Sequence, residues 1–259
     1  MNRVGRGWLA ERHSLAAEGA LVVGFYALYE TSRGLEAGGA SVAVHHARMI
    51  ASLERSLHVF VEAGVQHAAR GLPGLIGTLG ALYLTLHLVG TGTYLLWLHR
   101  RRPAAFPLVR TTLLIASGLA LIGYVAFPTA PPRMAALGIA DTISGGHVDL
   151  NHGLVSSLYN PFAAVPSMHV GYAAIVGASL IRDGRRPALR AMGVLYPVLV
   201  VLVIVATGNH FLFDAVAGLT VAAVAAGAAR LLVSSSVSRT RRDLAAVRPC
   251  LAATGSLET

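Results

Sequence analysis

Long apolar runs fill most of the chain, and polar residues gather in the segments between them. A helix needs about 20 apolar residues to cross a hydrocarbon core about 30 Å thick. The runs therefore predict six membrane-spanning helices, at residues 14–31, 75–98, 106–127, 167–181, 189–206 and 211–233. The fourth run is short, so we expect its first residues to lie near the membrane interface. The predicted fold is an all-α, integral-membrane bundle of six transmembrane helices.

A different pattern marks residues 43–69, which we expect to form an extra amphipathic helix. Apolar residues recur there at helical spacing, and charged or amide side chains fall largely on the other faces. The apolar positions are Ile50, Leu53, Leu57, Phe60, Val61, Val65 and Ala68, and the polar ones are Arg48, Glu54, Arg55, Glu62 and Gln66. This helix either lies in the outer membrane interface or packs on the external loop, and the pattern favours neither arrangement.

Composition supports a membrane protein. Of the 259 residues, 54% are hydrophobic and 13% are charged, whereas a soluble domain carries about 25% charged residues. The formal charge is +9, and all 21 basic residues are arginine. In a membrane protein such an excess indicates cytoplasmic loops, so we expect no nucleic-acid partner. The arginine-only composition favours a bacterial source, and the single cysteine, Cys250, excludes an internal disulfide.

The arginines are distributed unevenly between alternate loops. Segments 1–13, 99–110, 182–190 and 230–259 hold three, four, four and five of them, against four in 33–70 and one in 128–166. Because cytoplasmic loops are rich in basic residues, we expect both termini in the cytoplasm and the two longer loops outside the bacterial inner membrane. We expect one domain, 1–233, followed by a flexible cytoplasmic tail, 234–259. Glu18 and Glu30 make the first run a poor signal core, so we expect an uncleaved anchor.

His210 and Asp214 stand at the head of the last apolar run and are the first candidates for chemistry. On a helix, residues four apart lie one turn above each other on the same face. The carboxylate would accept the Nδ1 proton of the imidazole and leave Nε2 free to act as a nucleophile or a base. An aspartate inside a membrane helix costs about 3 kcal/mol, so it needs a partner and usually marks function. The alternative is an aspartate that is solvated at the helix end.

The segment "AVPSMHVGYAA" at 163–173 predicts a helix start at the head of the fourth run. Proline suits the first turn of a helix, and the Ser167 hydroxyl can cap free amides. The amides of Ser167, Met168 and His169 would then point outward, where a helix N-terminus binds an anion. His169 would stand at the same outer level as His210, although a lone histidine at a helix start is usually an interfacial residue.

Arg133 lies in the segment "FPTAPPRM" at 127–134, where the third run ends. The prolines prevent a continuing helix and fix the backbone around this residue. It is the one arginine in the sequence of the outer loop, and a guanidinium can clamp two phosphate oxygens. The alternative is an arginine that reaches the lipid headgroups. Arg133, the start of the fourth run and the two imidazoles together predict a phosphate site.

In their order along the chain, "PPR", "PSMH" and "HFLFDAVAG" resemble the three signature motifs of the type 2 phosphatidic acid phosphatase superfamily, especially its branch similar to inositol phosphorylceramide synthase. The similarity covers residues 43–233. The resemblance implies that His210 attacks phosphorus, that Asp214 orients His210, and that His169 protonates the leaving group.

The chain departs from these motifs at two cationic positions. Ala126 stands where the family has a lysine in the first motif, and Ile204 where it has an arginine in the third. Met168 replaces the glycine of the second motif. A phosphodiester carries less charge than a phosphomonoester, so fewer cations would suit a headgroup transferase or a diesterase. Alternatively, Arg48 or Arg55 of the amphipathic helix would replace the missing cations.

The sequence thus predicts a membrane enzyme that cleaves or transfers a phosphoryl group or phospho-headgroup of a lipid phosphate. The reaction would pass through a phosphohistidine on the extracytoplasmic side, with no metal and no cofactor. Phosphatidic acid, a polyprenyl phosphate and an inositol-containing phospholipid all fit, and membrane lipids are the other expected partners. One alternative, somewhat favoured by the missing cations, is a non-catalytic lipid-phosphate binding or transport protein. A histidine-rich metal or haem protein is a third possibility.

Other polar and small residues carry weaker signals. Tyr83 and His87 lie one turn apart inside the second run, where a buried polar residue suggests a role, and we prefer hydrogen bonding between helices. A group in the outer loop consists of His147, Asp149, Asn151 and His152. These loop residues could bind a metal, but such a group is more often solvated. Gly218 and Ala222 in the last run indicate close helix packing.

Overall fold

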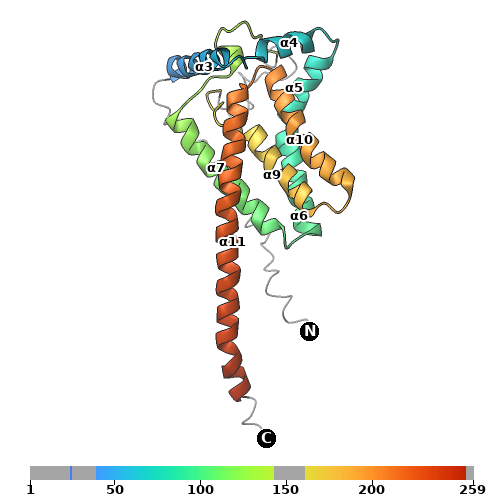
Figure 1. Ribbon diagram of the computed structural model, residues 1–259, viewed down its shortest axis with the longest axis vertical. Coiled ribbons are helices and arrows are strands. Elements are labelled where there is room, and N and C mark those ends of the chain that lie inside the picture. Colours follow the sequence, from blue (N-terminus) through green and yellow to red (C-terminus); the bar gives the residue numbers. More distant parts are fainter. Residues whose placement is uncertain (1–23, 25–38, 143–160, 255–259) are drawn as a thin grey trace.

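The computed structural model describes residues 39–142 and 161–254, together with Gly24, and it describes side chains as far as Ser234. Every named element of this part of the chain is a helix, which confirms the predicted all-α fold (Figure 1). The elements are α3 (Gly39–Ser56), α4 (Glu62–Arg70), α5 (Leu75–Thr85), η2 (Leu86–Gly90), α6 (Thr91–Arg101), α7 (Phe106–Ala126), η3 (Pro132–Met134), α9 (Met168–Asp183), α10 (Pro187–Ala206) and α11 (Leu212–Thr254). Of these, η2 is a turn of π-helix and η3 is a short 3-10 helix.

Four helices of the described residues are long and apolar enough to cross a membrane, and not six as predicted. They are the continuous stretch from α5 to α6, then α7, α10, and α11 as far as Ser234. The first predicted span, 14–31, lies outside the described residues. The fourth, predicted at 167–181, is α9, which has 16 residues. Such a helix rises about 24 Å, less than a hydrocarbon core about 30 Å thick.

The short helix α9 lies inside the bundle. It contacts α7, α10 and α11. Gly177 lets α9 approach α10 closely, because a Cβ at this position would overlap the Gly193 carbonyl. Gly218 does the same for α11, since its Cβ would overlap the Ser167 carbonyl, and this confirms the close packing predicted at Gly218. The apolar run of α9 therefore reflects burial against neighbouring helices.

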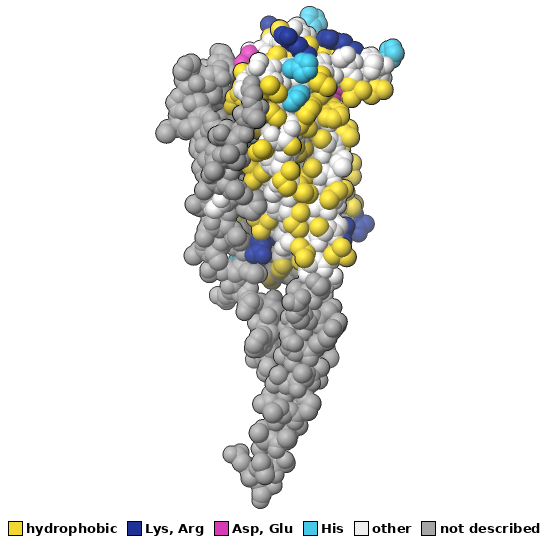
Figure 2. Space-filling model, turned by 90° about the vertical axis from the view of Figure 1, so that its left-hand side faces the viewer, with side chains coloured by type: hydrophobic (Ala, Val, Ile, Leu, Met, Phe, Trp, Pro, Cys, Tyr) yellow, Lys and Arg dark blue, Asp and Glu magenta, His cyan; other side chains and the backbone are white. Residues whose placement is uncertain are grey.

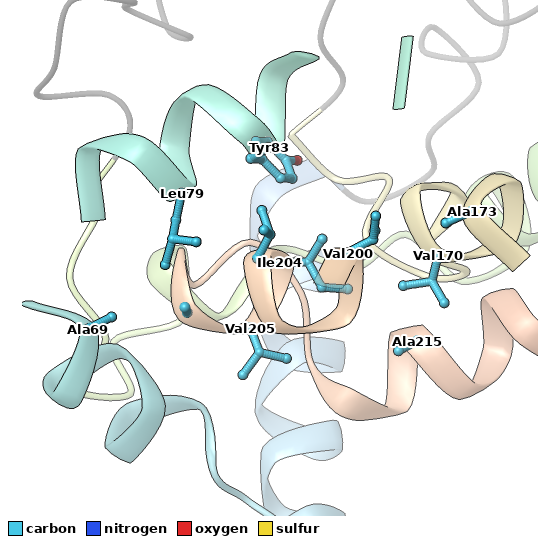
Figure 3. Close-up of a cluster of buried hydrophobic side chains, with 11 residues drawn as sticks. Ala69, Leu79, Tyr83, Val170, Ala173, Val200, Ile204, Val205 and Ala215 are labelled. Carbon is cyan, nitrogen blue, oxygen red and sulfur yellow. The ribbon is translucent and has the colours of Figure 1, made fainter. Parts of the chain in front are cut away.

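A hydrophobic cluster joins α4, α5, α9, α10 and α11 (Figure 3). Tyr83 of α5, Val170 of α9, Ile204 of α10 and Ala215 of α11 are among its buried members. These residues lie close in sequence to the polar residues predicted to form the site. The cluster thus fixes the positions of the helices that carry the site.

A π-helical turn, η2, interrupts the second predicted span between α5 and α6. The Tyr196 hydroxyl on α10 donates a hydrogen bond to the Leu86 carbonyl at 3.0 Å. Gly90 leaves room for this tyrosine, because a Cβ there would lie 2.9 Å from the Tyr196 hydroxyl oxygen. Single π turns inside helices are frequent at functional sites. This one carries His87.

The amphipathic segment forms two helices, and not the single helix predicted at 43–69. The break between α3 and α4 includes His58, whose φ of 58° places it in the left-handed region. The Val59 amide donates to the Glu54 carbonyl at 2.8 Å, as in the common helix ending in which a left-handed residue follows the last turn. Histidine adopts this conformation more readily than most residues, so the helix ends here although the apolar spacing continues.

Three of the polar residues in this segment face the protein. Glu54, Glu62 and Gln66 are buried, whereas Leu53 and Leu57 are exposed. Figure 2 shows apolar side chains along the bundle, and basic and histidine side chains at the end where α3 and α4 lie. The two glutamates are thus buried although they belong to the polar positions of the amphipathic pattern.

Both amphipathic helices hold the segment that follows α7. The Ala130 amide donates to the Ala43 carbonyl of α3 at 3.0 Å. The Gln66 side chain of α4 donates to the Ala140 carbonyl at 2.9 Å and accepts from the Ala140 amide at 2.7 Å. These contacts agree with the arrangement in which the amphipathic segment packs on the external loop.

The last helix, α11, is longer than the predicted span. It has 43 residues, which corresponds to about 65 Å, and it extends past the other helices (Figure 1). The sequence predicted that the span ends at 233 and that a flexible tail follows. Alanine, leucine and arginine, which are frequent after Ser238, are strong helix formers, so a helix can continue where the apolar pattern stops.

Candidate active site

Three segments that are far apart in the sequence meet at the end of the bundle where α3 and α4 lie. The Thr129 amide, after α7, donates to the Phe162 carbonyl at 2.8 Å, and the Ala164 amide donates to the Thr129 carbonyl at 3.2 Å. The Arg133 amide donates to the Gly208 carbonyl, in the turn between α10 and α11, at 3.1 Å. The structure thus brings together the three motif segments that the sequence predicted to share a site.

His210 lies just before α11, which begins at Leu212, and not within the helix as the sequence suggested. Its side chain is buried. Its Nδ1 lies 3.0 Å from the Ala164 carbonyl oxygen and 3.2 Å from Oδ2 of Asp214. The Ala164 carbonyl only accepts hydrogen bonds, so Nδ1 carries a proton, and Nε2 is the unprotonated nitrogen of the neutral ring. This is the tautomer that a nucleophilic imidazole needs.

Asp214 is fully buried and holds two groups at once. Besides contacting His210, its Oδ2 accepts the Phe211 amide at 2.9 Å. A side chain in the first turn of a helix that reaches back in this way satisfies one of the free amides at the helix start. The carboxylate therefore fixes the imidazole relative to α11.

His169, in the first turn of α9, lies beside His210 as predicted. The two ring centroids are 5.5 Å apart, and the ring planes are inclined by 58°. On the α5 side, the Tyr83 ring stacks on His169 with centroids 4.4 Å apart. The two imidazoles are therefore close enough to contact one tetrahedral group.

Tyr83 and His87 belong to this site, although the sequence favoured only hydrogen bonding between helices. The His87 ring lies 4.5 Å from the His169 ring and stacks on Tyr172 of α9 at 5.7 Å, measured between centroids. A histidine inside an apolar run was a signal for function, because a polar side chain there is costly. The π turn that carries His87 has no signature in the apolar pattern.

The start of α9 lies against the start of α11. The Ser167 amide donates to the Asp214 carbonyl at 3.0 Å, so it is not open to an anion as predicted. The Ser167 hydroxyl does not cap the helix, and this buried group has no hydrogen-bond partner among the described residues. The Met168 side chain packs in a hydrophobic cluster with α7 and α11 residues.

Arg133 is buried and bound by protein groups. Its Nε donates to Oδ1 of Asn209 at 3.0 Å, and its Nη1 donates to Oδ2 of Asp141 at 3.0 Å. Asn209 directly precedes His210 and also donates to the Thr207 hydroxyl at 2.9 Å. Arg133 therefore holds the turn that carries His210. The predicted phosphate contact would require the phosphate to replace Asp141, whose side chain is 33% exposed.

The two motif positions without a cation lie in different surroundings. Ala126 is the last residue of α7. Ile204 is fully buried, and its carbonyl accepts the amides of Asn209 at 3.1 Å and of His210 at 3.3 Å. A long charged side chain at Ile204 would have to enter the hydrophobic cluster.

The two arginines considered as replacements are exposed residues of α3. Arg48 donates from Nε to the Ala135 carbonyl at 3.2 Å. The Arg55 guanidinium lies over the Phe60 ring, 4.5 Å from its centroid. Both arginines thus contact the outer helices and the segment after α7, and these contacts do not include the two imidazoles.

The polar loop group with His147 and Asp149 lies outside the described residues. Within 39–142 and 161–234, no three histidine, cysteine, aspartate or glutamate side chains lie close enough together to hold a metal ion.

Comparison with protein families agrees with the geometry. The family model described as the PAP2 superfamily matches residues 48–228, which is well over half of the chain and includes Arg133, His169, His210 and Asp214. A search of curated proteins and a search of solved structures each found no match. The family match supports phosphatase or phosphotransferase activity in general. The chain belongs to the PAP2 superfamily.

Proposed function

We propose that the protein is a membrane enzyme that cleaves or transfers a phosphoryl group or phospho-headgroup of a lipid phosphate through a phosphohistidine on His210. The observation that carries the proposal is the pair of acceptors at its Nδ1, the Ala164 carbonyl and the Asp214 carboxylate. They leave the lone pair on Nε2, in a buried position beside His169. A neutral imidazole held in this way is a competent nucleophile.

In the first step, Nε2 of His210 attacks phosphorus, and the bond from phosphorus to the leaving oxygen breaks. The imidazole becomes positively charged, and the Ala164 carbonyl and the Asp214 carboxylate stabilise this charge through the Nδ1 proton. With the negatively charged phosphate bound, His169 holds a proton, and it gives this proton to the leaving alkoxide. General acid catalysis of this kind contributes about 10² to 10⁴ in rate.

In the second step, water or an acceptor alcohol attacks the phosphohistidine. His169, now neutral, takes the proton of the attacking hydroxyl, and the bond between phosphorus and Nε2 of His210 breaks. Water yields a free phosphate or phospho-headgroup, whereas an alcohol yields a transferred group. Both histidines return to their starting protonation states.

The phosphate oxygens need donors, because negative charge accumulates on them during the reaction. The start of α9 supports this role with the amides of Met168 and His169 and with the buried Ser167 hydroxyl. Arg133 would join them when the phosphate takes the place of Asp141. These groups form one side of the proposed phosphate site, and His210 forms the other.

Two features favour a phosphodiester substrate, as expected for a headgroup transferase of the branch that resembles inositol phosphorylceramide synthase. Ala126 and Ile204 supply no cation, and Arg133 is already paired with Asp141. A phosphodiester has one negative charge, whereas a phosphomonoester carries up to two. A site with fewer cations therefore suits the diester.

We place the site on the outer face of a bacterial plasma membrane. It lies at the C-terminal ends of α7 and α10 and the N-terminal end of α11. The arginine-rich segments 99–110 and 182–190 lie at the opposite ends of α7 and α10. Because arginine-rich loops favour the cytoplasm, this arrangement supports an extracytoplasmic site.

Assays of the purified protein in detergent test the proposal, with phosphatidic acid, a polyprenyl phosphate and phosphatidylinositol as substrates. Released phosphate indicates hydrolysis, and a new headgroup on an acceptor lipid indicates transfer. A short incubation with radiolabelled substrate should label the protein, with the acid-labile and alkali-stable behaviour of phosphohistidine. His210→Ala should lose both label and turnover, and equal turnover in this variant and the wild type would overturn the mechanism.

The alternative is a protein that binds or transports lipid phosphates without turnover. The same pairing of Arg133 with Asp141, together with the cation-free positions Ala126 and Ile204, favours it. In that case the wild type should bind lipid phosphates without product, and His210→Ala should bind them equally well.

A further inference from the structure

Three carboxylates surround the first turn of α11, directly after His210. The Phe211 amide donates to Asp214 Oδ2 at 2.9 Å. The Leu212 amide donates to Glu62 Oε1 at 2.9 Å, and the Phe213 amide donates to Glu54 Oε1 at 2.7 Å. Amides at a helix start have no partner within their own helix. Here three successive amides each have a different carboxylate.

Two of these carboxylates come from helices that lie outside the bundle. Glu54 belongs to α3 and Glu62 to α4, and their exposed fractions are 2% and 0%. Among the described residues, no arginine forms an ion pair with either of them. Burying such groups is costly unless other polar groups compensate, so their contacts with α11 account for their position.

The two glutamates also face each other. Their Oε2 atoms have no hydrogen-bond partner among the described residues unless one of the carboxyl groups is protonated. Burial, together with the nearby Glu62 carboxylate, raises the pKa of Glu54 from 4.5 to about 8, although the Phe213 amide works in the opposite direction. Near neutral pH Glu54 therefore keeps a proton, which it can donate to Glu62.

We propose that Glu54 and Glu62 are positioning residues that hold the first turn of α11 and thereby the imidazole of His210. This inference rests on the proposed function of His210 as the nucleophile. The chain of contacts is short, because Leu212 and Phe213 are the second and third residues after His210. A shift of this turn would move Nε2 away from the phosphorus it attacks, and small displacements of a reacting atom slow catalysis strongly.

We expect the hold of Glu54 and Glu62 on α11 to depend on pH, because of the charged groups around Glu54. Glu54 on α3 faces Glu62 on α4 and Asp214 on α11, and His210 lies beyond Asp214. The arginines of α3, Arg48 and Arg55, are exposed and point to other groups. Loss of the proton on Glu54 therefore removes its hydrogen bond to Glu62 and places two negative charges side by side, with no cation on α3 or α4 beside them, so repulsion moves α3 and α4 apart together with the turn that they hold.

Glu54→Gln is the decisive variant. The side-chain oxygen can still accept the Phe213 amide, and the new amide group can donate to Glu62, so the variant imitates the protonated pair at every pH. We expect wild-type kcat to fall as the pH rises through about 8, and this fall to be absent in Glu54→Gln. Glu54→Ala and Glu62→Ala should lower kcat about tenfold to hundredfold with little change in KM, because each leaves a buried amide without its partner.

Asp183→Asn is the matched control, since it removes one carboxylate at the far end of α9, and it should keep the wild-type pH profile. Thermal unfolding supplies a readout that is independent of activity. Because folding raises the pKa of Glu54, its stabilising effect is complete below 4.5 and is lost as the pH rises through about 8. The Tm of the wild type should therefore fall over this range relative to that of Glu54→Gln.

The outcomes separate this inference from the proposed function. A wild type that turns over no lipid phosphate ends the proposed function, whatever the unfolding data show. An active wild type overturns the inference if its alkaline loss of kcat persists in Glu54→Gln, or if Glu54→Ala keeps the wild-type kcat.

Discussion

The helices α9 and α11 begin side by side at the site, and their first turns are completed in opposite ways. At α11, the amides of 211–213 are bound by Glu54, Glu62 and Asp214. At α9, the first turn contains no acidic residue, and the Ser167 hydroxyl has no partner in the part of the chain that the structure describes. A helix start carries partial positive charge. Acidic side chains lie against this charge at α11, whereas none does in the first turn of α9.

The free amides at a helix start can bind either side chains of the protein or an anionic ligand, and we propose that α11 uses them in the first way and α9 in the second. The start of α11 holds His210, the proposed nucleophile, and its amides at 211–213 already donate to carboxylates. The start of α9 is the proposed place for the phosphate. The two are locked together by the hydrogen bond from the Ser167 amide to the Asp214 carbonyl and by the close approach at Gly218.

Among changes at the start of α11, Asp214→Asn should lower kcat most. The asparagine side chain has no negative charge, so it cannot stabilise the positive charge that His210 gains when Nε2 attacks phosphorus. We expect kcat to fall about 10³-fold to 10⁴-fold, by analogy with the same change in a serine-protease triad. Single-turnover measurements of phosphohistidine formation check this. A variant that forms the intermediate at the wild-type rate would contradict this role of Asp214.

At the start of α9, His169→Gln should have the next largest effect on kcat. Glutamine cannot give a proton to the leaving alkoxide, so we expect kcat to fall about 10²-fold to 10³-fold. A substrate with a nitrophenol leaving group does not need this proton, and the loss should then shrink to a few-fold in the first step. An equal loss with both substrates would assign His169 a structural role.

Sequence patterns predicted much of the fold, but not which helices face lipid. The lengths of the apolar runs identified α7 and α10 almost residue by residue. The run at 167–181 also predicted the helix α9, but it did not show that α9 is packed inside the bundle. An apolar run has the same pattern whether it contacts lipid or protein. What distinguishes α9 is its close contact with neighbours at Gly177 and Gly218, and such contacts depend on the partner helix.

The candidate site was predictable where its residues are close in sequence or stand in a motif. His210, Asp214 and His169 were found in this way. Glu54 and Glu62 were missed, because a polar residue in an amphipathic pattern is ordinarily placed on the solvent side. Their partners are 159 and 150 residues away in the sequence, so their role follows only from the folded chain.

Gly218→Ala tests the close contact between the starts of α9 and α11. The added Cβ would overlap the Ser167 carbonyl, so the helices must move apart. We expect a loss of about 1–3 kcal/mol of stability from overpacking and a fall of about tenfold in kcat, as the imidazoles separate. Gly227→Ala in the same helix is the matched control, because a Cβ there meets no atom within 4 Å. It should raise stability by up to about 1 kcal/mol; similar Tm changes in the two variants would contradict the close contact.

The smallest expected effect at the start of α9 is that of Ser167→Ala. This change should move stability and activity in opposite directions. In the free protein the buried hydroxyl has no partner among the described residues, so its removal should leave the free energy of unfolding unchanged or raise it by up to about 1 kcal/mol. With a phosphate in the site the hydroxyl is a donor, and its loss should lower kcat/KM about fivefold to tenfold. Unfolding and steady-state kinetics on the same preparation measure both effects. A variant that loses stability while kcat/KM stays unchanged would make Ser167 a structural residue, and the difference between the two helix starts would then have no bearing on phosphate binding.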